Sequence, residues 1–257
     1  RVQDARYFRS WLPLLATAAQ LAAAERLSRR GVLVRNVRSI EALGRIDVIC
    51  FDKTGTVTVG KIMLRSVSDG LFEQPLGELD DDHQRILAAG LRATPEADGS
   101  DVQPDPTDFA LIEGARKARV RTDFECTSWE RMSELPFEAG RGYHAVIAAT
   151  SFGSLLGVKG APEVILPHCV RRKQEGSEVA IDEEMRQRLN AEAALLGRKG
   201  LRVLAVAESA AGPDETIDPA NLRNLTFEGF LAFSDPVRPS APRAIEGLRR
   251  AGVDVIM

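Results

Sequence analysis

A predicted apolar strand that ends on a short polar loop constrains the fold of this chain more than any other feature. The strand covers residues 47–51, and the loop, residues 52–56, reads Asp-Lys-Thr-Gly-Thr. A continuously apolar strand is typical of a parallel sheet covered on both faces, so we expect Cys50 to be buried. Reactive groups in open parallel sheets lie at the carboxyl ends of the strands. The sequence therefore predicts that Asp52 lies at the reactive edge of an α/β sheet.

An aspartate in this position can act as a nucleophile toward phosphorus. Its carboxylate would form an acyl phosphate, and a divalent cation is needed because attack brings two anions together. Mg²⁺ prefers one or two carboxylates together with phosphate oxygens, so we expect Asp52 and Thr54 to contribute to a magnesium site. Gly55 allows a tight turn whose amides can face phosphate. From this short motif alone, a solvated turn stays open as the alternative.

The order of predicted elements indicates one domain inserted into another. A β-α pattern around Asp52 returns after about residue 225, and a strand-rich block lies between. Helices are expected at residues 12–30, 83–92, 106–119, 182–199 and 239–251. Strands are expected at residues 32–34, 47–51, 61–68, 129–150 (with a turn at 140–142), 154–159, 201–207, 225–233 and 253–257. Loops are expected at residues 71–82 and 94–105.

Composition limits the possible partners. The 257-residue chain has a net charge of −3 and 5% aromatic residues, which argues against a nucleic-acid partner. Three cysteines without metal-ligand spacing favour free thiols in a reducing compartment. We expect no cleavable signal peptide. The apolar stretch at residues 11–24 is shorter than the roughly 20 residues that span a bilayer, so it is either a buried or amphipathic helix or the inner end of a membrane helix.

Residues 52–58, DKTGTVT, closely resemble the phosphorylation signature DKTGTLT of P-type ATPases, and residues 31–35 and 40–44 resemble the family's approach to that site. The chain looks most similar to bacterial cation pumps of the calcium-ATPase-like branch. The resemblance implies that Asp52, with Lys53 and Thr54, forms the catalytic loop of a pump that uses ATP and Mg²⁺ to move a cation across the cell membrane.

The resemblance also implies a fold and its division. The fold is α/β: a partial haloacid-dehalogenase-like phosphorylation domain carries an inserted α+β nucleotide-binding domain built on an antiparallel sheet. Residues 1–30 would be a stalk that connects to the membrane. Residues 31–66 and 228–257 would form the phosphorylation domain, and residues 67–227 the nucleotide-binding domain.

Thr54 separates two reactions within the broader superfamily. Phosphatases usually carry a second Asp at this position as general acid and base. A threonine hydroxyl cannot serve as a carboxylate base near neutral pH. The resemblance therefore favours a long-lived phosphoenzyme, as a pump needs, over a soluble phosphatase, which we keep as an alternative.

Separate segments resemble the family's ATP pocket: residues 105–108 (DPTD), 136–138 (PFE), 159–163 (KGAPE) and 200–205 (GLRVLA), with residues 234–239 (SDPVRP) as the return to the phosphorylation domain. The implied nucleotide contacts are Asp108, Phe137, Arg141, Lys159, Gly160, Arg202 and Asp235. Simpler readings exist for some of them. Asp108 would suit any helix N-terminus, Phe137 could be a core residue, and Arg202 could be an ordinary strand residue in solvent.

The family's later motifs, a Thr-Gly-Asp loop and a Gly-Asp-Gly segment, would follow residues 255–257. We therefore expect this polypeptide alone to bind ATP but to form little phosphoenzyme, and a non-catalytic nucleotide-binding remnant of a pump stays open. Residues 9–13, RSWLP, stand where many relatives have PEGLP, so the carboxylate that helps to coordinate the ion is lost and the transported ion cannot be inferred.

Overall fold

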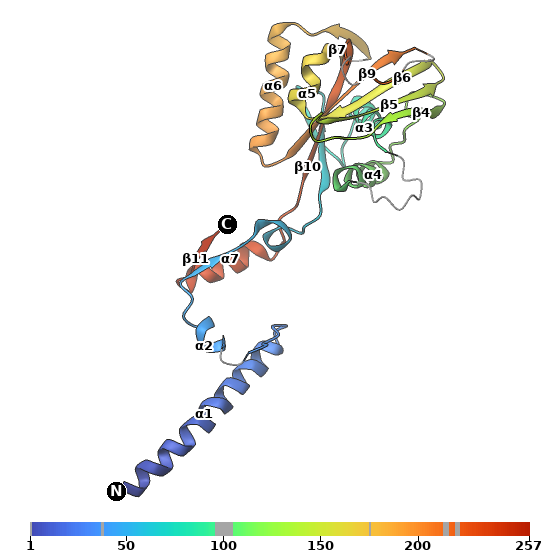
Figure 1. Cartoon of the computed structure of the whole chain (residues 1–257). Coiled ribbons are helices and arrows are strands. Elements are labelled where there is room, and N and C mark those ends of the chain that lie inside the picture. The colour runs from blue at the N-terminus through green and yellow to red at the C-terminus, as the bar shows by residue number, and fades with distance from the viewer. Residues whose placement is uncertain (1, 37–38, 96–104, 175, 213–215, 219–221) are drawn as a thin grey trace. The chain divides into compact units, whose positions relative to one another are not determined.

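The computed structural model describes residues 2–36, 39–95, 105–174, 176–212, 216–218 and 222–257. Most of the loop predicted at residues 94–105 therefore lies outside the described residues. The chain forms two compact units (Figure 1). Unit 1 consists of Arg1–Val57 and Val237–Met257, and unit 2 is Thr58–Pro236. Unit 2 extends beyond the predicted inserted block, residues 67–227, at both ends.

Unit 1 holds a small parallel β pair. Strand β1 (Val48–Cys50) pairs with β11 (Asp254–Ile256), and helix α7 (Ala241–Arg250) immediately precedes β11. Helices α1 (Val2–Ser28) and α2 (Ser39–Leu43) come earlier in the chain. No helix in the part of the chain that the structure describes is long and apolar enough to cross a membrane.

Unit 2 is built on one large, mostly antiparallel sheet. The strand order is β3-β2-β10-β9-β6-β5-β4, and β7 joins β10 in the only parallel pairing given for this sheet's described strands, with β8 next to β7. The strands are β2 (Met63–Ser68), β3 (Glu73–Pro75), β4 (Trp129–Leu135), β5 (Tyr143–Thr150), β6 (Gly153–Gly160), β7 (Cys169–Gln174), β8 (Ser177–Ala180), β9 (Arg202–Ala211) and β10 (Leu225–Ser234).

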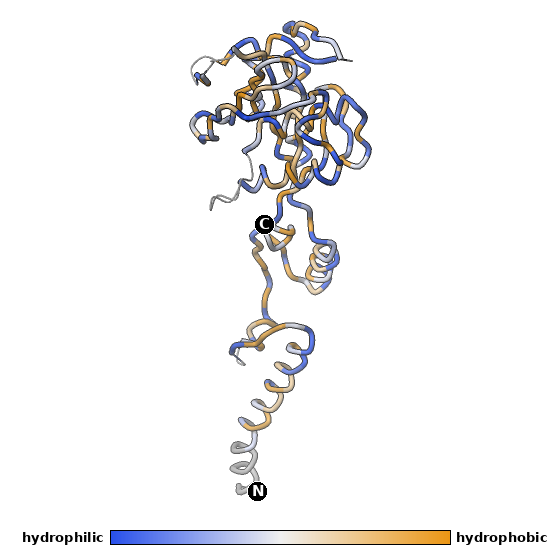
Figure 2. Tube along the Cα trace, turned by 90° about the vertical axis from the view of Figure 1, so that its right-hand side faces the viewer, coloured by the Kyte–Doolittle hydropathy of each residue, from blue (hydrophilic) through white to orange (hydrophobic). Residues whose placement is uncertain are grey.

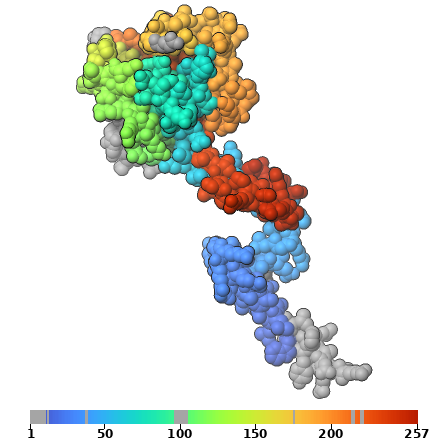
Figure 3. Space-filling view, turned by 180° about the vertical axis from the view of Figure 1, so that it is seen from behind, coloured from blue at the N-terminus to red at the C-terminus, as the bar shows by residue number. Residues whose placement is uncertain are grey.

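Helices cover both faces of this sheet (Figure 1). Helices α3 (Asp81–Arg92) and α4 (Pro106–Ala118) pack on one face through a core that includes Leu87, Leu111 and Phe233. Helices α5 (Pro162–Ile165) and α6 (Glu183–Arg198) pack on the other face, against a core that includes Leu189 and Phe227. Figure 3 shows the region of α3 in teal at the surface of unit 2, beside the green region that includes α4.

Most predicted elements of unit 2 are confirmed, and the misses are short edge elements. The segment predicted as a loop at residues 71–82 contains β3, which ends on Pro75 and pairs only with β2 among the described strands. Proline is tolerated there because an edge strand has amides without ladder partners. Strands β7 and β8 were not predicted, because their charged sequences lack an apolar alternation.

Two predictions for unit 1 are wrong. Residues 32–34 form no strand, because no described strand lies beside them to complete a ladder. Cys50 is exposed rather than buried. The run around it is apolar, as the orange colour of hydrophobic residues in Figure 2 indicates, but β1 pairs with β11 alone among the described strands, and Val48 is 46% exposed.

Candidate functional site

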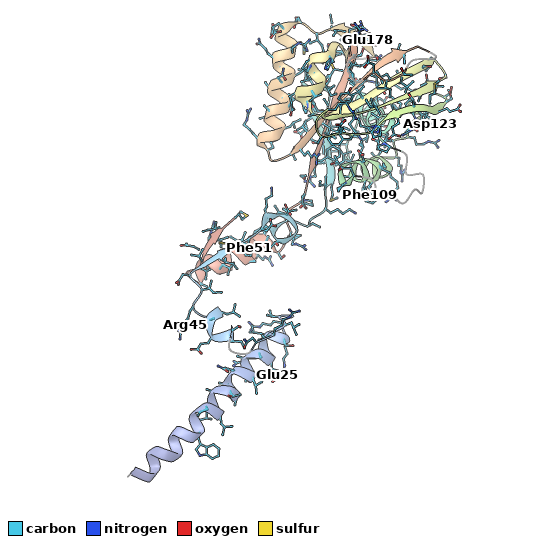
Figure 4. All side chains as sticks on the ribbon, in the orientation of Figure 1. Glu25, Arg45, Phe51, Phe109, Asp123 and Glu178 are labelled. Atoms are coloured by element: carbon cyan, nitrogen blue, oxygen red, sulfur yellow. The ribbon has the colours of Figure 1, made fainter. Side chains whose placement is uncertain are left out.

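Asp52 follows directly on β1 at the carboxyl end of the parallel pair. The amide of Phe51, which Figure 4 labels, donates to the carbonyl of Ile256 over 2.9 Å, so the pairing continues to the residue before Asp52. Asp52 itself is exposed, and the Thr54 amide lies 3.4 Å from its Oδ1. Asp52 therefore lies at the end of a parallel strand, as the sequence predicted. The strand itself is not buried on both faces, as had been expected.

The loop after Asp52 is tied down from the other end of unit 1. Gly55 has φ of +77°, a left-handed conformation that favours glycine. The Arg238 side chain donates to the Gly55 carbonyl over 2.9 Å, and the Arg238 amide donates to the Val57 carbonyl over 2.9 Å. The turn at Lys53–Val57, whose backbone is not helical at Thr54 and Gly55, is thus held by a residue that lies far away in the sequence.

The residues of this loop fit part of a magnesium site. Asp52 offers an exposed carboxylate and Thr54 an oxygen two residues later, whereas Mg²⁺ takes near-octahedral oxygen ligands that include phosphate and water. Among the residues that the structure describes, no group of three or more His, Cys, Asp or Glu side chains could hold a metal ion. Asp52 and Thr54 would therefore hold the ion only together with phosphate oxygens and water.

In unit 2, sheet register brings several predicted nucleotide residues to one end of the sheet. Gly160 at the end of β6 pairs with Tyr143 at the start of β5 and with Ala205 on β9. Arg202, the first residue of β9, pairs with Phe233 on β10. The loop that holds Phe137 leads into β5, so this loop, Gly160 and Arg202 come from the same end of the sheet.

Lys159, one residue before Gly160, is almost fully buried, with 4% of its surface exposed. Its Nζ donates to Asp108 Oδ1 over 2.5 Å and to Thr94 Oγ1 over 2.8 Å. Burial lowers the pKa of Lys159, and the nearby Asp108 carboxylate opposes that shift. A buried ammonium needs such a partner, so Lys159 and Asp108, predicted separately, form one ion pair between the sheet and α4.

Helix α4 places Asp108 in its first turn. Asp105 is the N-cap and accepts from the Thr107 amide over 2.8 Å, with Pro106 at the first helical position. An acidic residue in the first turn suits the helix dipole, which was the simpler reading of Asp108. Asp108 has a second role as the partner of the buried Lys159 ammonium. Only 13% of its side chain is exposed, and its carboxylate bonds to this residue of the sheet.

A partly buried polar network surrounds this pair at the end of α3. Arg131 on β4 donates to the Thr94 carbonyl over 2.5 Å and to Glu134 Oε2 over 2.5 Å. His144 on β5, the cross-strand neighbour of Lys159, lies 2.9 Å from the Ala93 carbonyl through Nδ1 and 2.9 Å from Glu134 Oε1 through Nε2. Burial works to raise the pKa of Glu134, but the donors His144 and Arg131 outweigh it, and the pKa is lowered.

The sequence interpretation missed these network residues. His144, Thr94, Arg131 and Glu134 belong to no motif of the resemblance. The position of His144 opposite Lys159 could be found from the sequence only if the β5–β6 register were known. The turn at Ser151-Phe152 sets that register, since the strands pair from Thr150↔Gly153 to Tyr143↔Gly160.

Gly160 has a packing role within the protein. A Cβ atom there would lie 2.5 Å from Cβ of Tyr143 and 2.6 Å from the Gly142 carbonyl oxygen, distances that real Cβ atoms do not adopt. The sequence suggested close approach of a ligand to this glycine. The structure gives close approach of the neighbouring strand β5.

Phe137 and Arg141 lie on the same loop but differ in exposure. Phe137 is 58% exposed, so it is not a core residue. The Arg141 side chain donates to the carbonyl of Pro136 and to Glu138 Oε2, and its guanidinium lies 5.4 Å from the Tyr143 ring centroid. Arg141 is therefore engaged in holding the loop that presents Phe137.

Arg202 and Asp235 have different surroundings. Arg202 is exposed at the start of β9. Asp235 follows β10 and accepts hydrogen bonds from Thr58 Oγ1 over 2.5 Å and from the amides of Gly60 and Lys61 over 2.9 and 3.2 Å. Asp235 thus joins the two ends of unit 2, a role that the sequence did not indicate.

Comparison with known protein families identifies the family of this chain. The family model for the cytoplasmic domain N of P-type ATPases matches residues 87–240, more than half of the chain and all strands of the described sheet except β2 and β3. The chain belongs to the P-type ATPase family.

Relatives extend the similarity to both units. A probable cation-transporting ATPase I of Mycobacterium leprae (strain TN) is 38% identical over 96% of this chain. A magnesium-transporting ATPase, P-type 1, of Salmonella typhimurium is 29% identical over 95%, and a calcium-transporting ATPase 1 of Bacillus cereus is 27% identical over 96%. The chain spans only 15%, 26% and 28% of these three relatives, respectively, so it corresponds to one part of a P-type ATPase.

Proposed function

We propose that this chain is the ATP-binding and phosphorylation portion of a P-type cation-transporting ATPase, in which unit 2 binds ATP and Asp52 of unit 1 accepts its terminal phosphoryl group. The observation that carries the proposal is the buried Lys159–Asp108 pair at the sheet end that also presents the exposed ring of Phe137. A buried cation at a sheet end that also presents an exposed aromatic ring is an arrangement that suits a nucleotide.

Each residue has a part in this proposal. The adenine stacks on Phe137, and Arg141 and Gly160 keep the loop and β6 in place for it. Lys159, held by Asp108, forms the cationic wall, and Arg202 reaches the phosphates, for which a guanidinium is well shaped. Asp235 acts by fixing the ends of unit 2 rather than by touching the nucleotide.

The phosphoryl transfer would occur in unit 1. An oxygen of the Asp52 carboxylate attacks the γ-phosphorus and forms a new P–O bond, while the bond to the β–γ bridging oxygen breaks and ADP leaves with its electron pair. When bound, Mg²⁺ neutralises charge on the phosphate oxygens. Lys53 adds a positive charge beside the loop, and Thr54 supplies no carboxylate base, so the aspartyl phosphate persists long enough to drive a pump.

We further infer that unit 1 is part of a haloacid-dehalogenase-like phosphorylation domain. The parallel β1–β11 pair, with Asp52 at its carboxyl end and α7 before β11, supports this assignment. In the whole pump, residues 1–30 would lead from the membrane, where the cation is moved. The names of these relatives support a cation as cargo, and they differ in which cation they specify.

Titration of the chain with ATP, followed by calorimetry, tests the nucleotide site. Phe137→Ala should weaken ATP binding by roughly tenfold, because base–aromatic stacking contributes about 1–3 kcal/mol. Phe152→Ala is the matched control: Phe152 is 83% exposed in the turn at the other end of β5, so this change should leave the affinity unaltered. Both rings are exposed, so neither change disturbs the core.

A second substitution addresses the ion pair. Lys159→Ala removes the buried ammonium group and should abolish measurable ATP binding. Far-ultraviolet circular dichroism of the same variant reports whether the sheet is still folded. If the folded chain shows no heat of ATP binding, or if Phe137→Ala and Phe152→Ala behave alike, the proposed nucleotide site is wrong.

A further inference from the structure

Thr94 lies where the end of α3 meets the sheet, and it is 2% exposed. Its hydroxyl donates to the Gly90 carbonyl over 2.7 Å and accepts from Lys159 Nζ over 2.8 Å. Its own carbonyl accepts from the Arg131 side chain over 2.5 Å. The Gly90 carbonyl belongs to the last turn of α3, where helix carbonyls lack intrahelical partners. One threonine hydroxyl therefore joins this helix end to strand β6.

The ammonium group of Lys159 carries three N–H groups, and all of them are donors. Among the residues that the structure describes, two acceptors are bonded to it: Asp108 Oδ1 over 2.5 Å and Thr94 Oγ1 over 2.8 Å. The N–H groups of an ammonium point to three corners of a tetrahedron, so two fixed bonds also fix the direction of the third. That third N–H is the one left for a ligand, and 4% of the side chain remains exposed.

The Thr94 hydroxyl decides whether this third N–H has a set direction. With both acceptors in place, the Lys159 ammonium is held from the end of α3 and from α4 at the same time. Without Thr94, the ammonium would turn about its remaining bond to Asp108. A donor that must be ordered during binding gives weaker binding than a preorganised one. Asp108 alone therefore keeps the positive charge in place but does not fix its orientation.

We propose that Thr94 is a positioning residue of the nucleotide site, which fixes the Lys159 ammonium so that its remaining N–H is directed at an acceptor atom of ATP. This inference rests on the proposed function, in which unit 2 binds ATP beside Lys159. Thr94 acts through Lys159 and needs no contact with the nucleotide itself. Its role differs from core packing, because the hydroxyl rather than the methyl group makes the bond.

The test compares Thr94→Val and Thr94→Ser with the wild-type chain in ATP titrations followed by calorimetry. Valine keeps the shape of threonine but has no acceptor, whereas serine keeps the hydroxyl and lacks the methyl group. Thr94→Val should weaken ATP binding roughly tenfold, as expected for loss of a hydrogen bond to a charged group. Thr94→Ser is the matched control, and it should stay within about twofold of the wild type because the acceptor is retained.

Urea unfolding of the same variants separates positioning from packing. Both substitutions alter a buried side chain, so a purely structural role would lower the free energy of unfolding in each and leave their ATP affinities alike. If Thr94→Val fails to fold, Thr94→Cys takes its place: it resembles serine in size, its sulfur is a weak acceptor, and it should also weaken ATP binding. Equal ATP affinities in Thr94→Ser and in the variant without a good acceptor would overturn the inference.

A readout without nucleotide separates this inference from the proposed function. The NMR signal of the Lys159 ammonium, assigned by its absence in Lys159→Ala, should be visible in the wild type and in Thr94→Ser, because protons in buried hydrogen bonds exchange slowly with water. The signal should be lost in Thr94→Val. ATP binding by all variants with equal affinity and an unchanged ammonium signal would overturn this inference alone. Absence of ATP binding in the wild type would contradict the proposed function, and the role of Lys159 toward ATP with it.

Discussion

The two candidate sites of this P-type ATPase chain differ in how completely the chain surrounds them. In unit 2, Lys159 is 4% exposed and its Nζ has two side-chain partners, with a network of His144, Arg131 and Glu134 behind it. In unit 1, Asp52 is exposed after a pair of short strands. The proposed nucleotide site is held by contacts within its own unit, whereas the Asp52 loop presents its carboxylate to solvent.

This difference follows from what each function needs. Binding of a nucleotide requires a preformed binding surface, and a buried ion pair on a large sheet helps to form one. Phosphoryl transfer depends on positioning and charge neutralisation around the phosphate, which one exposed carboxylate does not provide. The contrast makes three predictions, given from the largest expected effect to the smallest.

The strongest test breaks the charge pairing on which the sheet of unit 2 depends. Arg92 on α3 donates to both carboxylate oxygens of Glu208, over 2.7 and 3.0 Å, inside the protein. Arg92→Met leaves Glu208 buried without its partner and should lower the free energy of unfolding by about 3–5 kcal/mol. Urea unfolding followed by circular dichroism measures the change. Arg116→Met, in an exposed pair with Glu113 on α4, is the control and should leave the midpoint unaltered. Equal midpoints for both variants would show that the buried pairing does not support unit 2.

A smaller effect comes from Glu228, which lies buried on β10 and pairs with Arg85. Burial and the nearby Glu208 raise the pKa of Glu228 from 4.5 to about 7. A carboxyl group with a raised pKa binds its proton more tightly in the folded state, so its contribution to stability is lost as the pH rises from 4.5 to 7. Glu228→Gln should remove this loss, about 1–3 kcal/mol in the free energy of unfolding between pH 5 and pH 8.

The measurement is again urea unfolding, at pH 5 and pH 8, for the wild type and Glu228→Gln. Glu113→Gln, an exposed carboxyl on α4, is the matched control and should keep the wild-type difference between the two pH values. A variant at position 228 with the same pH dependence as the wild type would show that this carboxyl keeps its ordinary pKa.

The smallest expected signal concerns Asp52. When the chain is incubated with γ-³²P-labelled ATP and Mg²⁺, acid-stable label should stay below roughly one-tenth of a mole per mole, because an exposed carboxylate alone gives little positioning. Asp52→Asn sets the background. A stoichiometric label that this substitution abolishes would contradict the contrast between the units and show that the loop is competent as it stands.

The sequence predicted the long elements well, and short or non-local features poorly. Helices α4 and α6 were found because Asp105 and Asp182 cap them ahead of a regular pattern. Strand β7 was missed because Arg171, Arg172 and Lys173 obscure any alternation, and β3 was missed because its stability comes from β2. Exposure of Cys50 could not be read from an apolar run, since burial depends on what covers it.

At the site, the same limit applies. Lys159 and Asp108 were named from separate motifs, and the sequence contained no sign that they bond to each other. His144 lacked any motif and gained its place from the β5–β6 register. Asp235 was expected near the nucleotide, and nothing in the sequence indicated its bonds to Thr58, Gly60 and Lys61.

Those bonds of Asp235 have a practical consequence. Thr58 and Asp235 are 177 positions apart in the chain, yet one hydrogen bond of 2.5 Å joins them. A segment whose first and last residues meet can be excised, joined head to tail, or transplanted into a surface turn of a foreign host without stretching its backbone. Unit 2 is thus suited to insertion into a fluorescent protein, and with the ATP binding proposed above such a fusion would act as a genetically encoded nucleotide sensor.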